Sequence, residues 1–131
     1  HWCYGKIIER HSWSFILVAL RDKIARIDLA DNSTVFPIKD QKNIVGIEYD
    51  MKNNCIYWAD IDLDKIMRQC FSDGTTQEVI VDTNLSSTEG MALDWVSNVL
   101  FFVDGYHRAI FNCDSSYDNL IVSWSVVHEW K

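Results

Sequence analysis

The sequence predicts an all-β fold built from a repeated unit of four short strands. The segment 56–60 has a diverged copy at 100–104, and the two copies lie 44 residues apart. Each period contains four short apolar segments separated by Gly, Asn and Asp turn residues, and no window shows the period of a long amphipathic helix. Repetition at this spacing, with four strands in each unit, is typical of a propeller blade. We therefore expect a partial β-propeller of two to three blades.

The first blade is expected to begin with the apolar run at residue 15. Its strands, separated by turn residues, are expected at 15–20, 23–28 and 35–38. Pro37 places the last of these strands at a sheet edge, because proline cannot donate a hydrogen bond to a neighbouring strand.

The second blade repeats the same order of strands. The strands expected in it are 44–50, 56–60, 65–70 and 77–81. Residues 54–60 are interpreted as the inner strand of the blade, and the last segment as the outer one. Gly46 and Gly90 also stand 44 residues apart, which indicates that a third blade opens at 90–94.

Both ends of the chain depart from this pattern. Residues 1–14 show no clear period, and no restart of the repeat follows residue 118. We therefore expect blades over 15–118, flanked by divergent segments at 1–14 and 119–131. The chain starts at His1 without a charged and then apolar leader, so it is interpreted as a piece of a longer polypeptide.

Composition narrows the classes of function. The chain has 131 residues, 48% of them hydrophobic, which suits one domain with a packed core. The chain has 12 Lys and Arg and 19 Asp and Glu, and the resulting net charge of −7 argues against nucleic acid as a partner. No apolar run approaches the roughly 18–20 residues of a membrane-spanning helix. We therefore expect no direct membrane insertion by this segment.

The repeated segment resembles the YWTD repeats of the low-density-lipoprotein receptor class B family. Residues 57–60 read Tyr-Trp-Ala-Asp, which is the motif with Ala59 in place of Thr. Weaker copies of the motif, and segments similar to the family's following strand and its Asp-Gly turn, lie at 101–104, 17–20, 65–68 and 72–75. The likeness covers roughly residues 15–118 and is greatest to the propellers of sorting receptors.

This resemblance implies a six-bladed ring, of which the chain carries a part, in the extracellular or lumenal region of a membrane-anchored receptor. Such a receptor is expected at the cell surface, in endosomes and in the Golgi, and it acts in endocytosis or protein sorting. The propeller would be a non-catalytic module for protein ligands and adjacent receptor modules, with no cofactor and no metal. Candidate binding residues lie in turns at one rim: Asp62, Asp64 and His107.

The motif residues themselves are expected to hold the blades together. Tyr57, Trp58 and Phe102 would fill the layer between neighbouring sheets, because large rings contribute much buried area; direct ligand contact is the alternative. Asp60 and Asp104 end their strands, where a carboxylate can accept backbone N–H bonds from a neighbouring turn and tie one blade to the next. A catalytic carboxylate at the mouth of a channel is the other interpretation of the two aspartates.

Cys55 and Cys70 lie at matching distances from the turn between two expected strands. An antiparallel hairpin places such residues opposite each other, within reach of a disulfide that would stabilise the fold by about 3 kcal/mol. A bridge would indicate an oxidising compartment, whereas two buried thiols in a cytosolic protein are the alternative. A zinc site has less support, because no Cys-x-x-Cys or His pair completes four ligands. Cys3 and Cys113 have no evident partner in the sequence.

Asn32 and Asn84 each begin an Asn-x-Ser/Thr triplet in a turn-rich stretch. Both are candidate N-glycosylation sites. Together with the expected disulfide, these triplets favour the secretory route.

A different class of function is the runner-up. Six-bladed propeller hydrolases of the lactonase type hold a divalent cation with carboxylates at the centre of the ring. Glu48, Glu89 and Asp104 are the residues that would take this role here, although the sequence does not show that they converge.

Overall fold

The computed structural model describes residues 4–10, 13–72, 74, 76–82, 88–94, 96–106, 108–115 and 122–129. These residues form twelve β-strands, and none of them is helical. Within the described ranges, no helix is long and apolar enough to cross a membrane. The expected all-β class is confirmed.

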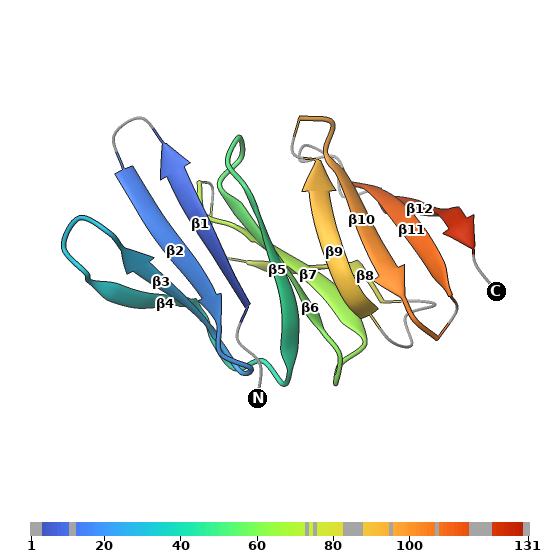
Figure 1. Cartoon of the computed structure of the whole chain (residues 1–131), viewed down its shortest axis with the longest axis horizontal. Helices are drawn as coiled ribbons and strands as arrows, with labels where there is room; N and C mark the ends of the chain where they lie inside the picture. Colours follow the sequence, from blue (N-terminus) through green and yellow to red (C-terminus); the bar gives the residue numbers. More distant parts are fainter. Residues whose placement is uncertain are drawn as a thin grey trace.

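The strands make three antiparallel sheets of four strands each. The first sheet contains β1 (Tyr4–Arg10), β2 (Trp13–Ala19), β3 (Ile24–Asp28) and β4 (Thr34–Ile38). The second sheet contains β5 (Ile44–Asp50), β6 (Cys55–Asp60), β7 (Lys65–Cys70) and β8 (Gln77–Val81). The third sheet contains β9 (Thr88–Asp94), β10 (Val99–Asp104), β11 (Ala109–Ser115) and β12 (Val122–Glu129). The sheets stand side by side as three blades, which confirms a partial propeller (Figure 1).

The first strand of each sheet, and not the motif strand, is the innermost one. β5 contacts both β1 and β9, so the first strands of the three sheets lie next to one another. β6 is the second strand of its sheet, and the interpretation of residues 54–60 as the inner strand is therefore wrong. The sequence misled here because β6 is buried on both faces. All six of its residues are buried. A strand buried on both faces shows a near-continuous apolar run whatever its position in the sheet.

The sheets extend beyond both expected boundaries. β1 lies wholly before residue 15 and pairs with β2 along its whole length. β12 lies after residue 118 and pairs with β11. The limits 15 and 118 are therefore not the limits of the blades, which run from Tyr4 to Glu129. Strand pairing is a backbone interaction, so the first strand of the first sheet and the last strand of the third can form where the side-chain repeat has faded.

The 44-residue repeat is present in the backbone as well as in the sequence. The register pairs Trp58 with Met67 in the second sheet and, 44 residues later, Phe102 with Phe111 in the third. Left-handed backbone positions repeat in the same way. They occur at Asn54 and Asn98, both with φ of 57°, and at Asp64 and Arg108, with φ of 51° and 52°. Equivalent turns therefore close equivalent hairpins in the two blades.

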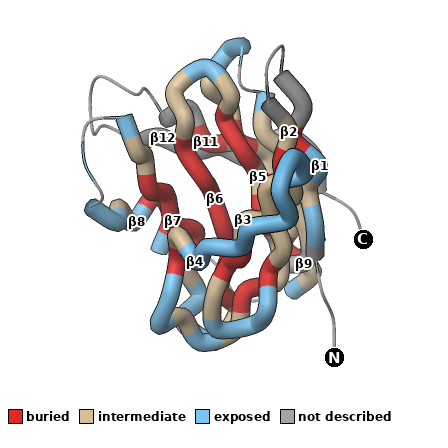
Figure 2. Tube along the Cα trace, turned by 90° about the vertical axis from the view of Figure 1, so that its left-hand side faces the viewer, coloured by how far each residue is buried: buried red, intermediate tan, exposed pale blue. Residues whose placement is uncertain are grey.

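Two apolar clusters fill the spaces between neighbouring sheets, and β6 contributes to both. Trp58 packs into the cluster shared with the first sheet, where Phe15 and Tyr49 meet edge to face at 5.4 Å. Tyr57 packs into the cluster shared with the third sheet, together with Phe102. Buried residues accordingly follow one another along β6 and β7 in the middle of the molecule (Figure 2). Alternate side chains of one strand thus join three sheets.

Candidate functional site

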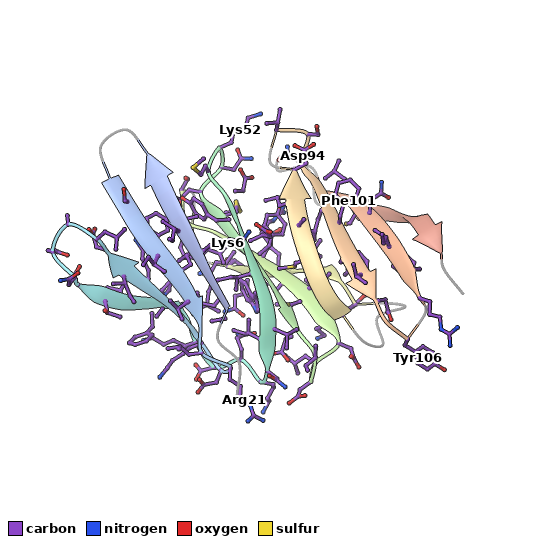
Figure 3. The ribbon with its side chains drawn as sticks, in the orientation of Figure 1. Lys6, Arg21, Lys52, Asp94, Phe101 and Tyr106 are labelled. Carbon is purple, nitrogen blue, oxygen red and sulfur yellow. A yellow bond between two sulfur atoms is a disulfide. The ribbon has the colours of Figure 1, made fainter. Side chains whose placement is uncertain are left out.

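The strand ends form two rims on opposite sides of the molecule. Figure 3 shows Arg21 and Tyr106 at one rim and Lys52 and Asp94 at the other. We call the first the Arg21 rim; it contains the turns and linkers at 20–23, 39–43, 61–64, 105–106 and 108. The second, the Lys52 rim, contains the turns at 51–54 and 96–98. Between the rims, the inner strands border an axial groove.

Asp60 joins two backbone segments at the Arg21 rim. Its carboxylate accepts hydrogen bonds from the backbone N–H groups of Lys42 at 2.8 Å and Asn43 at 3.1 Å, in the linker from the first blade to the second. It also accepts bonds from the N–H groups of Asp62 at 3.0 Å and Leu63 at 3.2 Å, in the turn after its own strand. The side chain is buried, so these charge-assisted bonds replace its hydration.

Asp104 occupies the equivalent place in the third blade. Its carboxylate is fully buried and accepts a hydrogen bond from the backbone N–H of Tyr106 at 2.9 Å. A second pair of aspartates does the same at the Lys52 rim, again 44 residues apart: Asp50 accepts bonds from the N–H groups of Lys52 and Asn53, and Asp94 from those at 96 and 97. Each of these three carboxylates thus closes a turn through Oδ1, which accepts backbone N–H groups.

The aromatic motif residues lie inside the molecule. Trp58 is 0% exposed, and its indole Nε1–H donates to Oε1 of Gln41 at 3.1 Å, in the linker that also contacts Asp60. Phe102 is buried and stacks on Phe111 with ring centroids 5.3 Å apart. Tyr57 is buried and accepts a hydrogen bond from Nη1 of Arg68 at 3.4 Å. None of these three rings is placed at the surface, where a ligand would meet it.

Arg68 is a buried cation between the second and third sheets. Its Nη2 forms an ion pair with Oε2 of Glu78 at 2.6 Å, and its guanidinium carbon lies 5.8 Å from the centre of the Tyr57 ring. Burial lowers the pKa of the Arg68 guanidinium, but the hydrogen bonds to Glu78 and Tyr57 outweigh burial and raise the pKa overall. Arg68 therefore stays charged at every physiological pH.

Cys55 and Cys70 are joined by a disulfide. They are directly opposite in the register of β6 and β7, with Cα atoms 4.0 Å apart. The bridge fixes one end of the hairpin whose other end is held by Asp60. Cys113 is buried in β11 within the cluster between the second and third sheets, and Cys3 lies outside the described residues.

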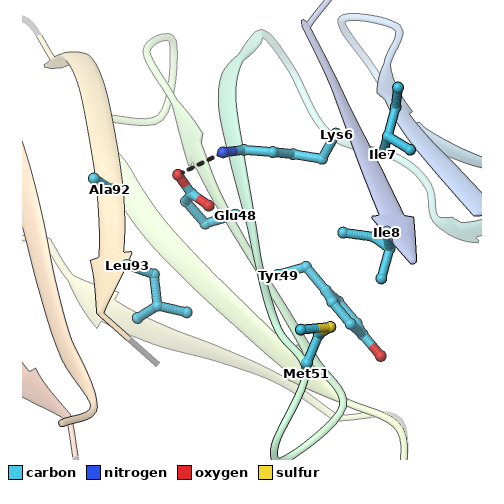
Figure 4. A pocket seen from close by; sticks show the side chains of 8 residues that line it. All are labelled: Lys6, Ile7, Ile8, Glu48, Tyr49, Met51, Ala92 and Leu93. Carbon is cyan, nitrogen blue, oxygen red and sulfur yellow. Dashed lines mark ion pairs between the residues drawn. The ribbon is translucent and has the colours of Figure 1, made fainter. Parts of the chain in front are cut away.

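The axial groove has a volume of about 630 Å³ and lies where β1, β5 and β9 approach one another. Lys6 of β1 reaches across to Glu48 of β5, and the ammonium lies 3.0 Å from Oε1 of the carboxylate (Figure 4). Ala92 and Leu93 of β9 line the opposite side. Lys6 is 42% exposed and Glu48 only 13%. Burial raises the pKa of Glu48 above its ordinary value, although the Lys6 ammonium partly opposes that effect.

The three carboxylates considered for a lactonase-type centre do not line this groove together. Glu48 lines it but is paired with Lys6. Asp104 is buried against the turn at the end of β10. The side chain of Glu89 lies outside the described residues. Across the part of the chain that the structure describes, no group of three or more His, Cys, Asp or Glu side chains is placed to hold a metal ion.

The candidate binding residues at the Arg21 rim are placed in exposed turns. Asp62 and Asp64 are exposed in the turn between β6 and β7, and the amide of Asn43 lies 3.5 Å from Oδ1 of Asp62. His107 lies outside the described residues. Sequence reasoning missed Tyr106, which is 74% exposed in the turn between β10 and β11. Its signal was its position two residues after Asp104, in the turn that follows β10.

One of the two glycosylation candidates is described. Asn32 is exposed in the turn between β3 and β4, with a left-handed φ of 60°. The N–H of the following Ser33 donates to Oδ1 of Asp31 at 2.9 Å, and this bond lowers the pKa of Asp31. Thr34, the third residue of the triplet, is also exposed. Asn84 lies outside the described residues.

Known receptors contain segments similar to this chain. Human low-density lipoprotein receptor-related protein 4 is 43% identical over 89 residues, which cover 64% of this chain and 4% of that protein. The mouse sortilin-related receptor is 42% identical over 69 residues, which cover 52% of this chain and 3% of the receptor. Chicken low-density lipoprotein receptor-related protein 8 is 31% identical over 101 residues, which cover 73% of this chain and 11% of that protein. The resemblance to receptor propellers of this family is confirmed.

No protein-family model matches the chain. Two solved propeller structures share its fold. A nidogen/laminin complex has a chain that matches with a TM-score of 0.66 and 24% identity, over 87% of this chain and 44% of that one. An auxiliary nutrient binding protein from Bacteroides thetaiotaomicron matches with a TM-score of 0.72 and 14% identity, over 92% of this chain and 31% of that one. Because both identities are low, these likenesses show the fold alone.

Proposed function

We propose that this chain is part of the propeller of an endocytic or sorting receptor, and that it serves as a non-catalytic module for binding protein ligands and adjacent receptor modules. The proposal is carried by the similarity to low-density lipoprotein receptor-related protein 4 and the sortilin-related receptor, at 43% and 41% identity in the human proteins. The chain spans only 4% and 3% of their lengths. The ligands and the membrane anchor of the whole receptor are therefore part of the proposal.

The Cys55–Cys70 disulfide and the exposed Asn32 triplet support an extracellular or lumenal location. Disulfides form and persist in oxidising compartments, and N-glycans are attached in the secretory route. A receptor that travels between the cell surface, endosomes and the Golgi would keep its propeller on that side of the membrane.

The Arg21 rim is the face that we assign to protein ligands. It combines the exposed ring of Tyr106 with the exposed side chain of Leu63 and the carboxylates of Asp62 and Asp64. Exposed aromatic residues surrounded by polar groups are typical of protein-binding surfaces. The linker and turn that Asp60 holds together give this rim a fixed backbone, which reduces the entropy lost on binding.

The partners of the candidate carboxylates favour scaffolding over catalysis. The oxygens of Asp60 accept backbone hydrogen bonds, and Glu48 is paired with Lys6. A lactonase-type centre needs carboxylates that converge on one cation, so these partners support the receptor over the hydrolase.

Binding to secreted proteins tests the proposal. The chain would be produced with a secretion signal, immobilised and exposed to an array of purified secreted and extracellular proteins, with surface plasmon resonance of every hit. Each hit would be measured again with the Arg21-rim variant Asp62→Asn, Asp64→Asn, Tyr106→Ala. A matched variant on the Lys52 rim, Lys52→Ala with Val96→Ala, serves as the control.

We expect the Arg21-rim variant to weaken binding at least about tenfold, because an aromatic anchor is typically worth about 2 kcal/mol. The control should bind as the unchanged chain does. In parallel, the chain would be assayed for lactone and ester hydrolysis with and without calcium. Calcium-dependent hydrolysis without any protein ligand would overturn the receptor proposal in favour of the hydrolase.

A further inference from the structure

In the second sheet, a buried arginine is paired with a carboxylate of the same sheet. The register places Arg68 of β7 opposite Tyr57 of β6 and opposite Glu78 of β8, so the three residues form a row across the sheet. Tyr57 in this row packs against the third sheet. Arg68 makes its ion pair with Glu78 at 2.6 Å within the row. The anion that this guanidinium needs is therefore supplied by the fourth strand of its own blade.

The first sheet repeats the arginine but not the carboxylate. Its equivalent row runs from Leu17 of β2 through Arg26 of β3 to Val35 of β4. Leu17 packs against the second sheet, so the row faces the next blade, as its counterpart does. Arg26 thus holds the place of Arg68, and Val35 holds the place of Glu78. The fourth strand of the first blade supplies an apolar side chain where that of the second supplies an anion.

A pocket of about 150 Å³ lies beside Arg26 and Val35, between the first and second sheets. Its floor is made of buried side chains, namely Phe15, Leu17, Tyr49 and Ile56, and its lip of partly or fully exposed ones, namely Arg26, Val35, Pro37, Asn54 and Phe71. Val35 is 56% exposed, so the pocket opens to the surface. Among the described residues that line it, Arg26 is the only charged one. An apolar cavity of this volume can hold one benzene-sized ring.

Two polar side chains border the apolar floor of this pocket. The guanidinium carbon of Arg26 lies 4.0 Å from the centre of the Phe15 ring. This contact uses the flat face of the guanidinium, whereas carboxylates are bound through its N–H edge. The hydroxyl of Tyr49 donates to Oδ1 of Asn54 at 2.6 Å, so the NH₂ group of Asn54 can serve as a further donor. Apolar walls with a few polar groups at fixed positions are typical of sites for small ligands.

We propose that this pocket binds a small carboxylic acid with an apolar ring or chain, and that the ligand's carboxylate pairs with Arg26 as Glu78 pairs with Arg68. The apolar part of the ligand would lie against Phe15 and Ile56. The acidic side chain of a protein partner fits less well, because it offers little apolar surface to these walls. The inference rests on the pocket and on the repeat of the blades, and it is independent of the proposed receptor function.

Titration with phenylacetate tests the proposal, with binding followed by NMR of the methyl groups of Leu17, Val35 and Ile56. Phenylacetamide has the same ring without the charge and is the control ligand. We expect phenylacetate to bind with a dissociation constant on the order of 1 mM, as fits a ligand of this size. Phenylacetamide should bind at least about tenfold more weakly, because it lacks the charge-assisted contact with Arg26. Equal binding of the two ligands, or no binding of either, would overturn the proposal.

Variants on the two strands locate the site. Arg26→Gln should weaken phenylacetate binding at least about tenfold, because it removes the charge. Val35→Glu should also abolish binding, since it places a carboxylate opposite Arg26, as Glu78 is placed opposite Arg68. Val79→Glu, the same change at a 44% exposed position in the fourth strand of the second sheet, should leave binding unchanged.

Methyl spectra without ligand would check that each variant keeps its fold. Binding to Arg26→Gln or to Val35→Glu that is as tight as binding to the unchanged chain would overturn the proposal. A capped peptide, acetyl-Leu-Glu-Leu-amide, tests the other source of a carboxylate. We expect this peptide to bind more weakly than phenylacetate. Equal or tighter binding of the peptide would assign the pocket to an acidic side chain of a protein partner and would overturn the proposal of a small acid.

Discussion

The carboxylate of Asp60 accepts a hydrogen bond from the backbone N–H of Lys42 at 2.8 Å, across the junction between the first and second blades. The same carboxylate closes the turn after its own strand through the N–H of Asp62. Asp60→Ala should lower the free energy of unfolding by about 2 kcal/mol, because hydrogen bonds to a charged group are worth about 1.5–3 kcal/mol and water can replace some of them. Urea unfolding followed by tryptophan fluorescence measures this change.

Asp62→Ala is the matched control, because Asp62 is exposed in the same turn. Its effect should stay within about 0.5 kcal/mol, as is usual for surface changes. Equal losses for Asp60→Ala and Asp62→Ala would show that the buried carboxylate does not join the blades.

The disulfide between Cys55 and Cys70 should be present in material made in an oxidising compartment, and its mass should rise by two hydrogens on reduction. The double variant Cys55→Ala, Cys70→Ala should lower the free energy of unfolding by about 3 kcal/mol, since the bridge closes a loop with a sequence separation of 15. Comparing oxidised and reduced unchanged chain provides the control. Stability that does not depend on the reductant would contradict a structural role for the bridge.

Trp58 should be the most costly of the motif side chains to remove. It is fully buried between the first and second sheets and bonded to Gln41. Trp58→Ala should cost about 3–5 kcal/mol, as large-to-small changes in cores do, whereas Trp58→Phe keeps a ring and should cost about 1–2 kcal/mol. Far-ultraviolet circular dichroism during urea unfolding measures both. If Trp58→Ala lowers the free energy of unfolding by less than Trp58→Phe does, the ring does not lie in the core.

Glu48 should make stability depend on pH in mildly acidic solution. Burial raises its folded-state pKa above the unfolded value, so the folded protein binds a proton more tightly than the unfolded chain. The contribution of Glu48 to the free energy of unfolding should therefore rise as pH falls from neutral through the folded-state pKa. It should level off below the unfolded-state pKa of about 4.3.

Glu48→Gln should remove this pH dependence, because the amide does not titrate. The difference between the unchanged chain and Glu48→Gln, measured by urea unfolding from pH 7 to pH 4, isolates the group. If the unchanged chain instead loses stability relative to Glu48→Gln as pH falls, the ion pair with Lys6 outweighs burial.

The repeat made the blades predictable from the sequence. Period, turn residues and the symmetric positions of Cys55 and Cys70 are local properties, and each hairpin closes over a few residues. The order of strands from the axis outward is not local. β6 is apolar on both faces, and such a strand has no side-chain signal for its distance from the axis.

The axial groove could not be predicted from the sequence either. Lys6 and Glu48 meet only because β1 and β5 pack side by side, and the two residues belong to different blades. β12 has no motif of its own and forms through backbone pairing with β11. Contacts of this kind depend on how blades sit against one another, which a period of 44 residues does not specify.

Nuclear Overhauser effects between backbone protons of the motif hairpins test most directly whether successive stretches of this chain build the same blade. We expect contacts between Trp58 and Met67 and, in the same register 44 residues later, between Phe102 and Phe111. Contacts between β5 and β6 should join Ile47 to Trp58. A different register in the two hairpins, or helical contacts in either of them, would contradict a propeller of equivalent blades.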